Sequence, residues 1–210
     1  MKIEIKKTEK PVDYGEAIRF LEQRVEKIHK KEEKELIWIL KHRSIYTAGT
    51  SYRESEVLDK SVKLFITNRG GKITYHGPGQ LICYFVINLN KRKKDIRNFI
   101  NTIENTIIDV LKEYKIKAFA DRKNIGIWVK NKKKNKKLGA IGIRIKKWIA
   151  YHGFSINIKN NLDNFKKIIP CGIKNKNVTS LKEISKISYS KFIDILEKKL
   201  IKNLSVSNYS

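Results

Sequence analysis

The chain has 210 residues, with 47 basic and 21 acidic side chains, a formal charge of +26 and only two cysteines. The length suits a single domain over residues 1–210 with its own core, and a hydrophobic content of 40% excludes a disordered chain. No run approaches the roughly 18 apolar residues of a membrane span, and two cysteines do not indicate a disulfide framework.

The first ten residues alternate charged side chains with isoleucine and lack the apolar core of a signal peptide, so we expect a cytoplasmic protein without membrane attachment. The positive charge could serve nucleic acid, an anionic surface or acidic proteins, or reflect compositional drift. Its lysines are spread along the whole chain, without zinc-finger spacing or an RNP signature. We therefore do not expect nucleic acid as the main partner, whereas acidic protein partners would be attracted by the charge.

The first part of the chain predicts one helix among several strands. Ala17, Leu21 and Val25 share one stripe at helical spacing, so residues 12–31 are expected to be helical. Short apolar or alternating runs predict strands at 2–7, 35–41, 64–68 and 81–87, with a strand end and a loop over 42–52. The run at 81–87 is apolar throughout, which is typical of a strand buried on both faces.

The second part predicts a long helix, a group of strands and a closing helix. Apolar residues recur at helical spacing over 95–114 and again over 192–204, and Ser180 is a candidate cap for a short helix at 181–184. Strands are expected at 125–130, 137–145 and 148–158, with a polar hairpin tip at 131–137 and a loop or short helix at 160–169. Helices and strands do not alternate strictly. This order indicates an α+β fold with a mixed, largely antiparallel sheet flanked by helices.

Residues 69–80, Arg-Gly-Gly-Lys-Ile-Thr-Tyr-His-Gly-Pro-Gly-Gln, hold four of the chain's eleven glycines and precede the apolar run at 81–87. A plain hairpin turn is the simplest interpretation, although such loops are usually only about two to five residues long. The segment lacks the sequence pattern of a P-loop or a dinucleotide-binding loop. Glycines permit close approach of the backbone to another group, so we expect a loop that forms part of a binding site.

Cys171 is either a structural residue or a nucleophile, since Pro170 and Gly172 could present its thiol at a tight turn. Cys83 lies inside the apolar run and is expected to be a core residue. A free thiol with a pKa of ~8.5 is only about 3% thiolate at pH 7, so a reactive cysteine needs a nearby cation. Lys137, His76 and His152 are the candidates; a zinc site of the two histidines and Cys171 would lack close-spaced ligand pairs.

These segments together resemble the lipoyl(octanoyl) transferase family, the octanoyl-[acyl carrier protein]:protein N-octanoyltransferases. Residues 69–80 resemble its first signature, and the blocks from Lys137 to Arg144, from His152 to Asn157 and from Pro170 to Gly172 follow in order. The resemblance spans nearly the whole chain. Residues 131–136 look like a local lysine-rich extension, and Gly139 stands where another small residue is expected. Lys137 is chosen among adjacent lysines by its distance from Ala140.

The resemblance implies the catalytic fold of biotin and lipoate protein ligases and a two-step acyl transfer with no cofactor, ATP or metal. Cys171 would carry the octanoyl group, and Lys137 would assist it. The implied donor is octanoyl-acyl carrier protein, and the acceptors are lipoyl domains of 2-oxoacid dehydrogenases and the glycine cleavage H protein. The implied acyl-binding residues are Arg69, Gly70, Gly71, Lys72, Ile73, Thr74, Tyr75, His76, Ala140, Ile141, Gly142, Gly153, Phe154 and Ser155.

Two other functions stay open at this point. An ATP-dependent lipoate or biotin protein ligase would share the fold and the glycine-rich loop, but it would need a nucleotide site and no cysteine nucleophile. A basic nucleic-acid-binding protein would show tight binding with a steep dependence on salt and would not need Cys171. The Pro-Cys-Gly turn together with the lysine block therefore favours the acyltransferase.

Overall fold

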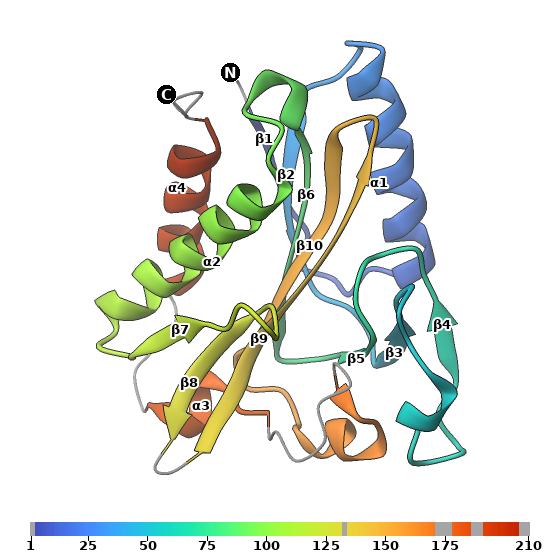
Figure 1. Cartoon of the computed structure of the whole chain (residues 1–210), viewed down its shortest axis with the longest axis vertical. Helices are drawn as coiled ribbons and strands as arrows, with labels where there is room; N and C mark the ends of the chain where they lie inside the picture. The colour runs from blue at the N-terminus through green and yellow to red at the C-terminus, as the bar shows by residue number, and fades with distance from the viewer. Residues whose placement is uncertain (1–2, 132–133, 171–177, 186–190, 206–210) are drawn as a thin grey trace.

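The computed structural model describes residues 3–131, 134–170, 178–185 and 191–205. Its main sheet contains β1 (Ile3–Lys7), β2 (Glu35–Leu40), β6 (Gln80–Asn88), β7 (Ala118–Ala120), β8 (Ile127–Asn131), β9 (Lys134–Lys146) and β10 (Ile149–Asn157). The strands lie in the order β1-β2-β6-β10-β9-β8-β7 (Figure 1). Strands β1 and β2 are parallel, and all other neighbours are antiparallel. The predicted mixed, largely antiparallel sheet is confirmed.

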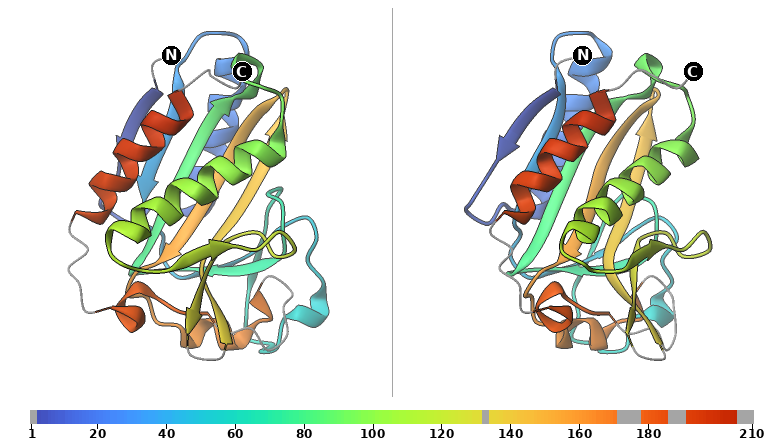
Figure 2. Two further views of the ribbon diagram at one scale, coloured as in Figure 1. Left: turned by 60° about the vertical axis from the view of Figure 1, so that its left-hand side comes forward. Right: turned by 90° about the vertical axis from the view of Figure 1, so that its left-hand side faces the viewer.

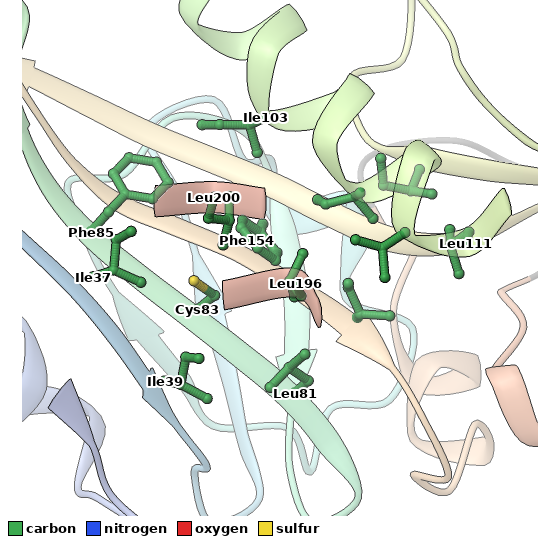
Figure 3. Packing of buried hydrophobic residues seen from close by; sticks show 14 of the residues in the cluster. Ile37, Ile39, Leu81, Cys83, Phe85, Ile103, Leu111, Phe154, Leu196 and Leu200 are labelled. Carbon is green, nitrogen blue, oxygen red and sulfur yellow. The ribbon is translucent and has the colours of Figure 1, made fainter. Parts of the chain in front are cut away.

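Helices cover both faces of this sheet, as the two views of Figure 2 show. Helix α1 (Tyr14–His29) lies on one face, and α2 (Ile96–Glu113) and α4 (Phe192–Ser205) lie together on the other. Alternate residues of β6 pack on opposite faces of the sheet. Tyr84 packs in the cluster with α1, whereas Cys83 and Phe85 pack with α2 and α4 (Figure 3). Because side chains alternate across a strand, burial on both faces explains the uninterrupted apolar run.

A second, three-stranded sheet carries the glycine-rich segment. It consists of β3 (Ile45–Ala48), β4 (Leu64–Ile66) and β5 (Ile73–His76), in the order β4-β3-β5. The prediction of a continuous loop over 69–80 is therefore wrong at 73–76. Ile73 and Tyr75 alternate with Thr74 and His76, and this short period-two pattern was obscured by the surrounding glycines. Ile73 and Tyr75 are buried in the core of the small sheet.

Several element boundaries differ from the predictions. The first helix begins after Asp13, whose carboxylate accepts a hydrogen bond from the Glu16 N–H at 2.9 Å. The expected hairpin tip at 131–137 is wrong from Lys134 onward, because β9 already begins there. Strand β7, which is only three residues long, was not predicted. Ser180 precedes α3 (Leu181–Ile184) as expected, but its side chain makes no capping hydrogen bond.

Short 3₁₀ helices connect several elements, at Glu54–Glu56, Leu89–Lys91 and Asp163–Lys167. The last of these agrees with the loop or short helix expected at 160–169. Among the described helices, none combines the length and apolarity that crossing a bilayer requires.

Candidate active site

A cavity of about 430 Å³ lies where the glycine-rich segment meets β9 and β10. The glycine-rich segment is joined to β9 by a hydrogen bond that the Gly70 N–H donates to the Ile143 carbonyl at 3.0 Å. This volume falls within the usual range of small-molecule sites, roughly 300–1,000 Å³. The predicted residues that line the cavity are Arg69, Gly70, Gly71, Lys72, Thr74, His76, Lys137, Ala140, Ile141, Gly142, Gly153, Phe154 and Ser155.

Two predicted site residues do not line the cavity, and a third is not described. Ile73 and Tyr75 belong to the core of the small sheet and do not belong to the described cavity lining. Strand alternation is the cause, since Thr74 and His76 face the cavity from the same strand. Cys171 lies outside the described residues.

The floor of the cavity depends on close contact between β6 and β10. Gly153 pairs with Tyr84 on β6, and a Cβ at position 153 would overlap the Cys83 carbonyl oxygen. Glycine is therefore required there for the two backbones to lie side by side. Next to it, His152 has φ +70° and its ring stacks on that of Tyr151 at 4.8 Å. Successive strand side chains normally point to opposite faces, so this backbone conformation brings His152 to the Tyr151 side.

The two cavity histidines are uncharged at neutral pH. Burial, followed by the nearby His42, lowers the pKa of His76 to about 3, and its Nδ1 donates to Gln80 Oε1 at 2.7 Å. Burial, followed by Arg69 and Arg144, lowers the pKa of His152 to about 3. Of the candidate cations for a reactive thiol, these two histidines therefore provide no positive charge at neutral pH.

Lys137 is a buried amine in the cavity wall, with only 7% of its surface exposed. Its Nζ donates to the Ile125 carbonyl at 2.9 Å and lies 5.3 Å from the centre of the Trp128 ring. A β-bulge shapes its backbone, because Lys137 and Gly139 oppose the adjacent residues Trp128 and Ile127. Bulges change the direction in which side chains point, and this bulge lies at the residue whose amine borders the cavity.

Residues 178–179 pair with Lys137, and Pro170 lines a small cavity that Lys137 shares. Pro170 and Val178 line a small cavity together with Lys137 and Ser155. Val178 forms a β-bridge with Lys137, and the Thr179 N–H donates to the Lys137 carbonyl at 2.9 Å. Val178 and Thr179 are thus attached to the main chain of Lys137, and Pro170 shares a cavity with it.

Metal ligands do not gather at this site in the part of the chain that the structure describes, where no group of three His, Cys, Asp or Glu side chains could hold an ion. The zinc site considered from the sequence would also need Cys171, which is outside the described residues. Cys83 is fully buried, and burial raises the pKa of its thiol, so its predicted core role is confirmed.

Sequence reasoning missed several residues of the cavity wall: Tyr14, Tyr84, Asn124 and Ile125. They belong to separate elements and share no local motif. Only Tyr84 carried a signal, since a phenol inside the apolar run at 81–87 needs a polar partner, and His42 Nε2 lies 2.9 Å from its oxygen. Ile125 was predicted as the first residue of a strand, but β8 begins only at Ile127, and nothing in that pattern indicated that Asn124 or Ile125 would line a cavity.

Over residues 13–201 the sequence matches the family described as lipoyl protein ligase A/B catalytic domain. The chain belongs to this family. Proteins named octanoyltransferase from Ehrlichia chaffeensis and from the Wolbachia of Brugia malayi are 44% and 42% identical to it, over 95% and 91% of this chain and 94% of each relative. This confirms the resemblance seen in the sequence and identifies the protein as an acyltransferase.

Two solved structures with the same fold are lipoate protein ligases. A bipartite ligase from Thermoplasma acidophilum has a TM-score of 0.74 at 14% identity, over 98% of this chain and 84% of that one. A lipoate-protein ligase A bound with ATP has a TM-score of 0.72 at 17% identity, over 98% of this chain and 86% of that one. At such low identity these structures establish the fold alone, which confirms the predicted ligase-type catalytic architecture.

Proposed function

We propose that the protein transfers an octanoyl group from octanoyl-acyl carrier protein to a lysine of a lipoyl domain, through a thioester on Cys171. The observation that carries this proposal is the buried amine of Lys137 in the wall of an acyl-sized cavity. Lys137 also lines a small cavity together with Pro170, the residue before Cys171. The octanoyltransferase relatives support the acyl group. Such a transfer would be the first step in making the lipoyl cofactor on its carrier proteins.

In the first step, the Cys171 thiolate attacks the thioester carbonyl of the donor and a new thioester forms on Cys171. The bond to the phosphopantetheine sulfur breaks, and that sulfur leaves as a thiolate. The Lys137 ammonium had favoured the Cys171 thiolate. It now gives a proton to the phosphopantetheine thiolate and becomes a neutral amine. Charge and protons balance without a metal or nucleotide in this scheme.

In the second step, the lysine of the acceptor attacks the Cys171 thioester and forms an amide. Neutral Lys137 takes the proton that the attacking amine loses, and Cys171 leaves as a thiolate. The starting pair of ammonium and thiolate is thereby restored. Main-chain amides beside Ala140 and Gly153 are candidates to stabilise the negative oxygen that forms on the carbonyl in both steps.

The cavity offers the acyl chain a wall of main chain and apolar side chains from Gly70, Ala140, Ile141, Gly142 and Phe154. Burying a methylene contributes about 0.8 kcal/mol, so the tail supplies several kcal/mol of binding. Neutral His76 and His152 suit this apolar ligand better than charged imidazoles would, because a buried charge beside a hydrocarbon chain is costly.

The proposed donor and acceptors are octanoyl-acyl carrier protein and the lipoyl domains of 2-oxoacid dehydrogenases and of the glycine cleavage H protein. These partners are acidic proteins as a class, and the chain's charge of +26 would attract them. We expect the reaction to take place in the cytoplasm, where a reducing environment keeps Cys171 as a thiol.

Raising the ionic strength is expected to slow transfer, since salt screens the attraction between oppositely charged partners. We expect kcat/KM for octanoyl-acyl carrier protein to fall roughly tenfold or more between low and high salt. Octanoyl-pantetheine, which has the same thioester but no acidic carrier, provides the matched control and should acylate the enzyme at a nearly constant rate. Equal salt dependence with both donors would contradict electrostatic docking of the carrier.

The decisive test separates acyl transfer from ATP-dependent ligation. Purified protein is incubated with octanoyl-acyl carrier protein and a lipoyl domain after ATP has been removed with apyrase, and the lipoyl domain is analysed by mass spectrometry. We expect octanoylation of one lysine under these conditions. A parallel reaction with free octanoate and ATP should give none. Transfer only in the second reaction would establish a ligase in place of the proposed enzyme.

A further inference from the structure

Glu104 is a buried carboxylate on the apolar face of α2, with 5% of its surface exposed. Ile103 and Ile107 beside it pack in the core between the helix and the sheet, whereas Glu104 also lines a cavity with Asn101 and Arg122. Burying a carboxylate among apolar groups is costly unless hydrogen bonds or charges offset it. A glutamate at this position of the helix therefore needs an explanation other than packing.

The carboxylate of Glu104 accepts a hydrogen bond from the Gly126 N–H at 3.0 Å. Burial raises the pKa of Glu104, whereas the Gly126 N–H and the nearby charge of Lys137 lower it; Asp121 also faces it and raises it. The carboxylate thus interacts with the segment before β8 and with the amine beyond it. Figure 1 shows α2 lying across the sheet and leading through β7 into this segment.

The group that Glu104 holds is the peptide between Ile125 and Gly126, and the carbonyl of that same peptide accepts the hydrogen bond from Lys137 Nζ at 2.9 Å. In a trans peptide the N–H and C=O point in opposite directions. Carboxylate, peptide and amine therefore form one chain of hydrogen bonds, with the negative group at the N–H end and the positive group at the C=O end. Such an arrangement polarises the peptide and strengthens both bonds.

The backbone conformation at Gly126 and the close approach of Lys137 both require a glycine at this position. Its φ is +136°, and a Cβ at this position would lie 2.6 Å from Lys137 Cε and 2.6 Å from the Gly139 carbonyl oxygen. A side chain there would displace the stem of Lys137. Trp128 Nε1 donates to the Asn124 carbonyl at 2.8 Å, which fixes the residue directly before Ile125.

We propose that Glu104 is a positioning residue for Lys137: it fixes the Ile125–Gly126 peptide so that the carbonyl holds the amine at the acyl cavity. The inference rests on the proposed function in that Lys137 acts on the thioester sulfur. Among the described residues, the cavity lining does not include Glu104, so it acts on Lys137 from outside the cavity, through the peptide and through its charge.

Two substitutions separate the hydrogen bond from the volume of the side chain. Glu104→Met has a similar shape and a high helix propensity, but it cannot accept from the Gly126 N–H. Glu104→Gln keeps an acceptor oxygen. Asp109→Asn, on the exposed side of α2, is the matched control for removal of a carboxylate from this helix.

We expect Glu104→Met to lower kcat by roughly 10- to 100-fold, because a small misplacement of a reacting group has effects of this size. KM and the melting temperature should change little, and Glu104→Gln should recover most of the rate. A second readout does not depend on transfer: labelling of Lys137 by an amine-reactive ester, relative to exposed Lys134, should increase in Glu104→Met and not in Glu104→Gln.

Wild-type kcat and wild-type labelling in Glu104→Met would overturn the proposal, as would a loss of activity that merely follows a loss of melting temperature in both variants. Failure of the proposed function has a different signature. In that case the wild-type protein transfers no octanoyl group. Labelling of Lys137 still increases in Glu104→Met and not in Glu104→Gln, and the positioning role stands.

Discussion

Replacing Cys171 with alanine is expected to abolish the acyl-enzyme and to lower octanoyl transfer by at least about 10³-fold, since the covalent route is lost with its nucleophile. Intact-mass analysis after incubation with octanoyl-pantetheine should show one octanoyl group on the wild-type protein and none on Cys171→Ala. Hydroxylamine should remove the label, which identifies a thioester rather than an amide on one of the many lysines.

The chain's other cysteine provides the control. Cys83 is fully buried in the core, and burial raises the pKa of its thiol, so Cys83→Ala should still be acylated once folding is verified by its melting temperature. Full, hydroxylamine-sensitive labelling of Cys171→Ala would show that the acyl group is carried elsewhere and would exclude the proposed intermediate.

Lys137→Ala is expected to lower transfer by about 10²- to 10⁴-fold, the usual contribution of a positioned proton donor and acceptor. Removing the ammonium takes away a charge that favours the Cys171 thiolate, so the thiolate forms only at higher pH. The rate of Cys171 alkylation by iodoacetamide, measured against pH, should therefore have a midpoint displaced to higher pH in this variant.

Lys134 lies on the same strand but is exposed, so Lys134→Ala tests whether any loss of positive charge has the same effect. We expect this control to keep both the transfer rate and the alkylation midpoint of the wild-type protein. Should Lys137→Ala and wild-type protein share one alkylation profile, Lys137 would have no influence on the thiol and the first step would need another proton donor.

Among the predicted elements that agree with the structure, those with a long pattern were the clearest in the sequence. Helix α2 and the paired strands β9 and β10 extend over enough residues for their apolar period to be distinct. Strand β5 was missed because four residues between glycines show too little of an alternating pattern. The three-residue strand β7 was missed for the same reason, and its position is given by pairing with β8.

The candidate site was predictable where its residues are neighbours in the sequence. Arg69, Gly70 and Gly71 form one motif and Ala140, Ile141 and Gly142 another, and both line the cavity. Ile125 and Glu104 belong to no motif, because they reach Lys137 through one carbonyl and one backbone N–H. Any residue type can provide a backbone carbonyl, so a hydrogen bond to the main chain cannot be recognised from the sequence.

The sequence alone determined the class of fold, the family and the residues that stand out chemically, because apolar periods and compact motifs are local properties of a chain. Only the tertiary structure decided which of those residues share one cavity, that His76 and His152 are neutral, and that a buried glutamate reaches Lys137 through a peptide group. These features depend on burial and on distances between separate elements, and both arise only when the sheets and helices pack together.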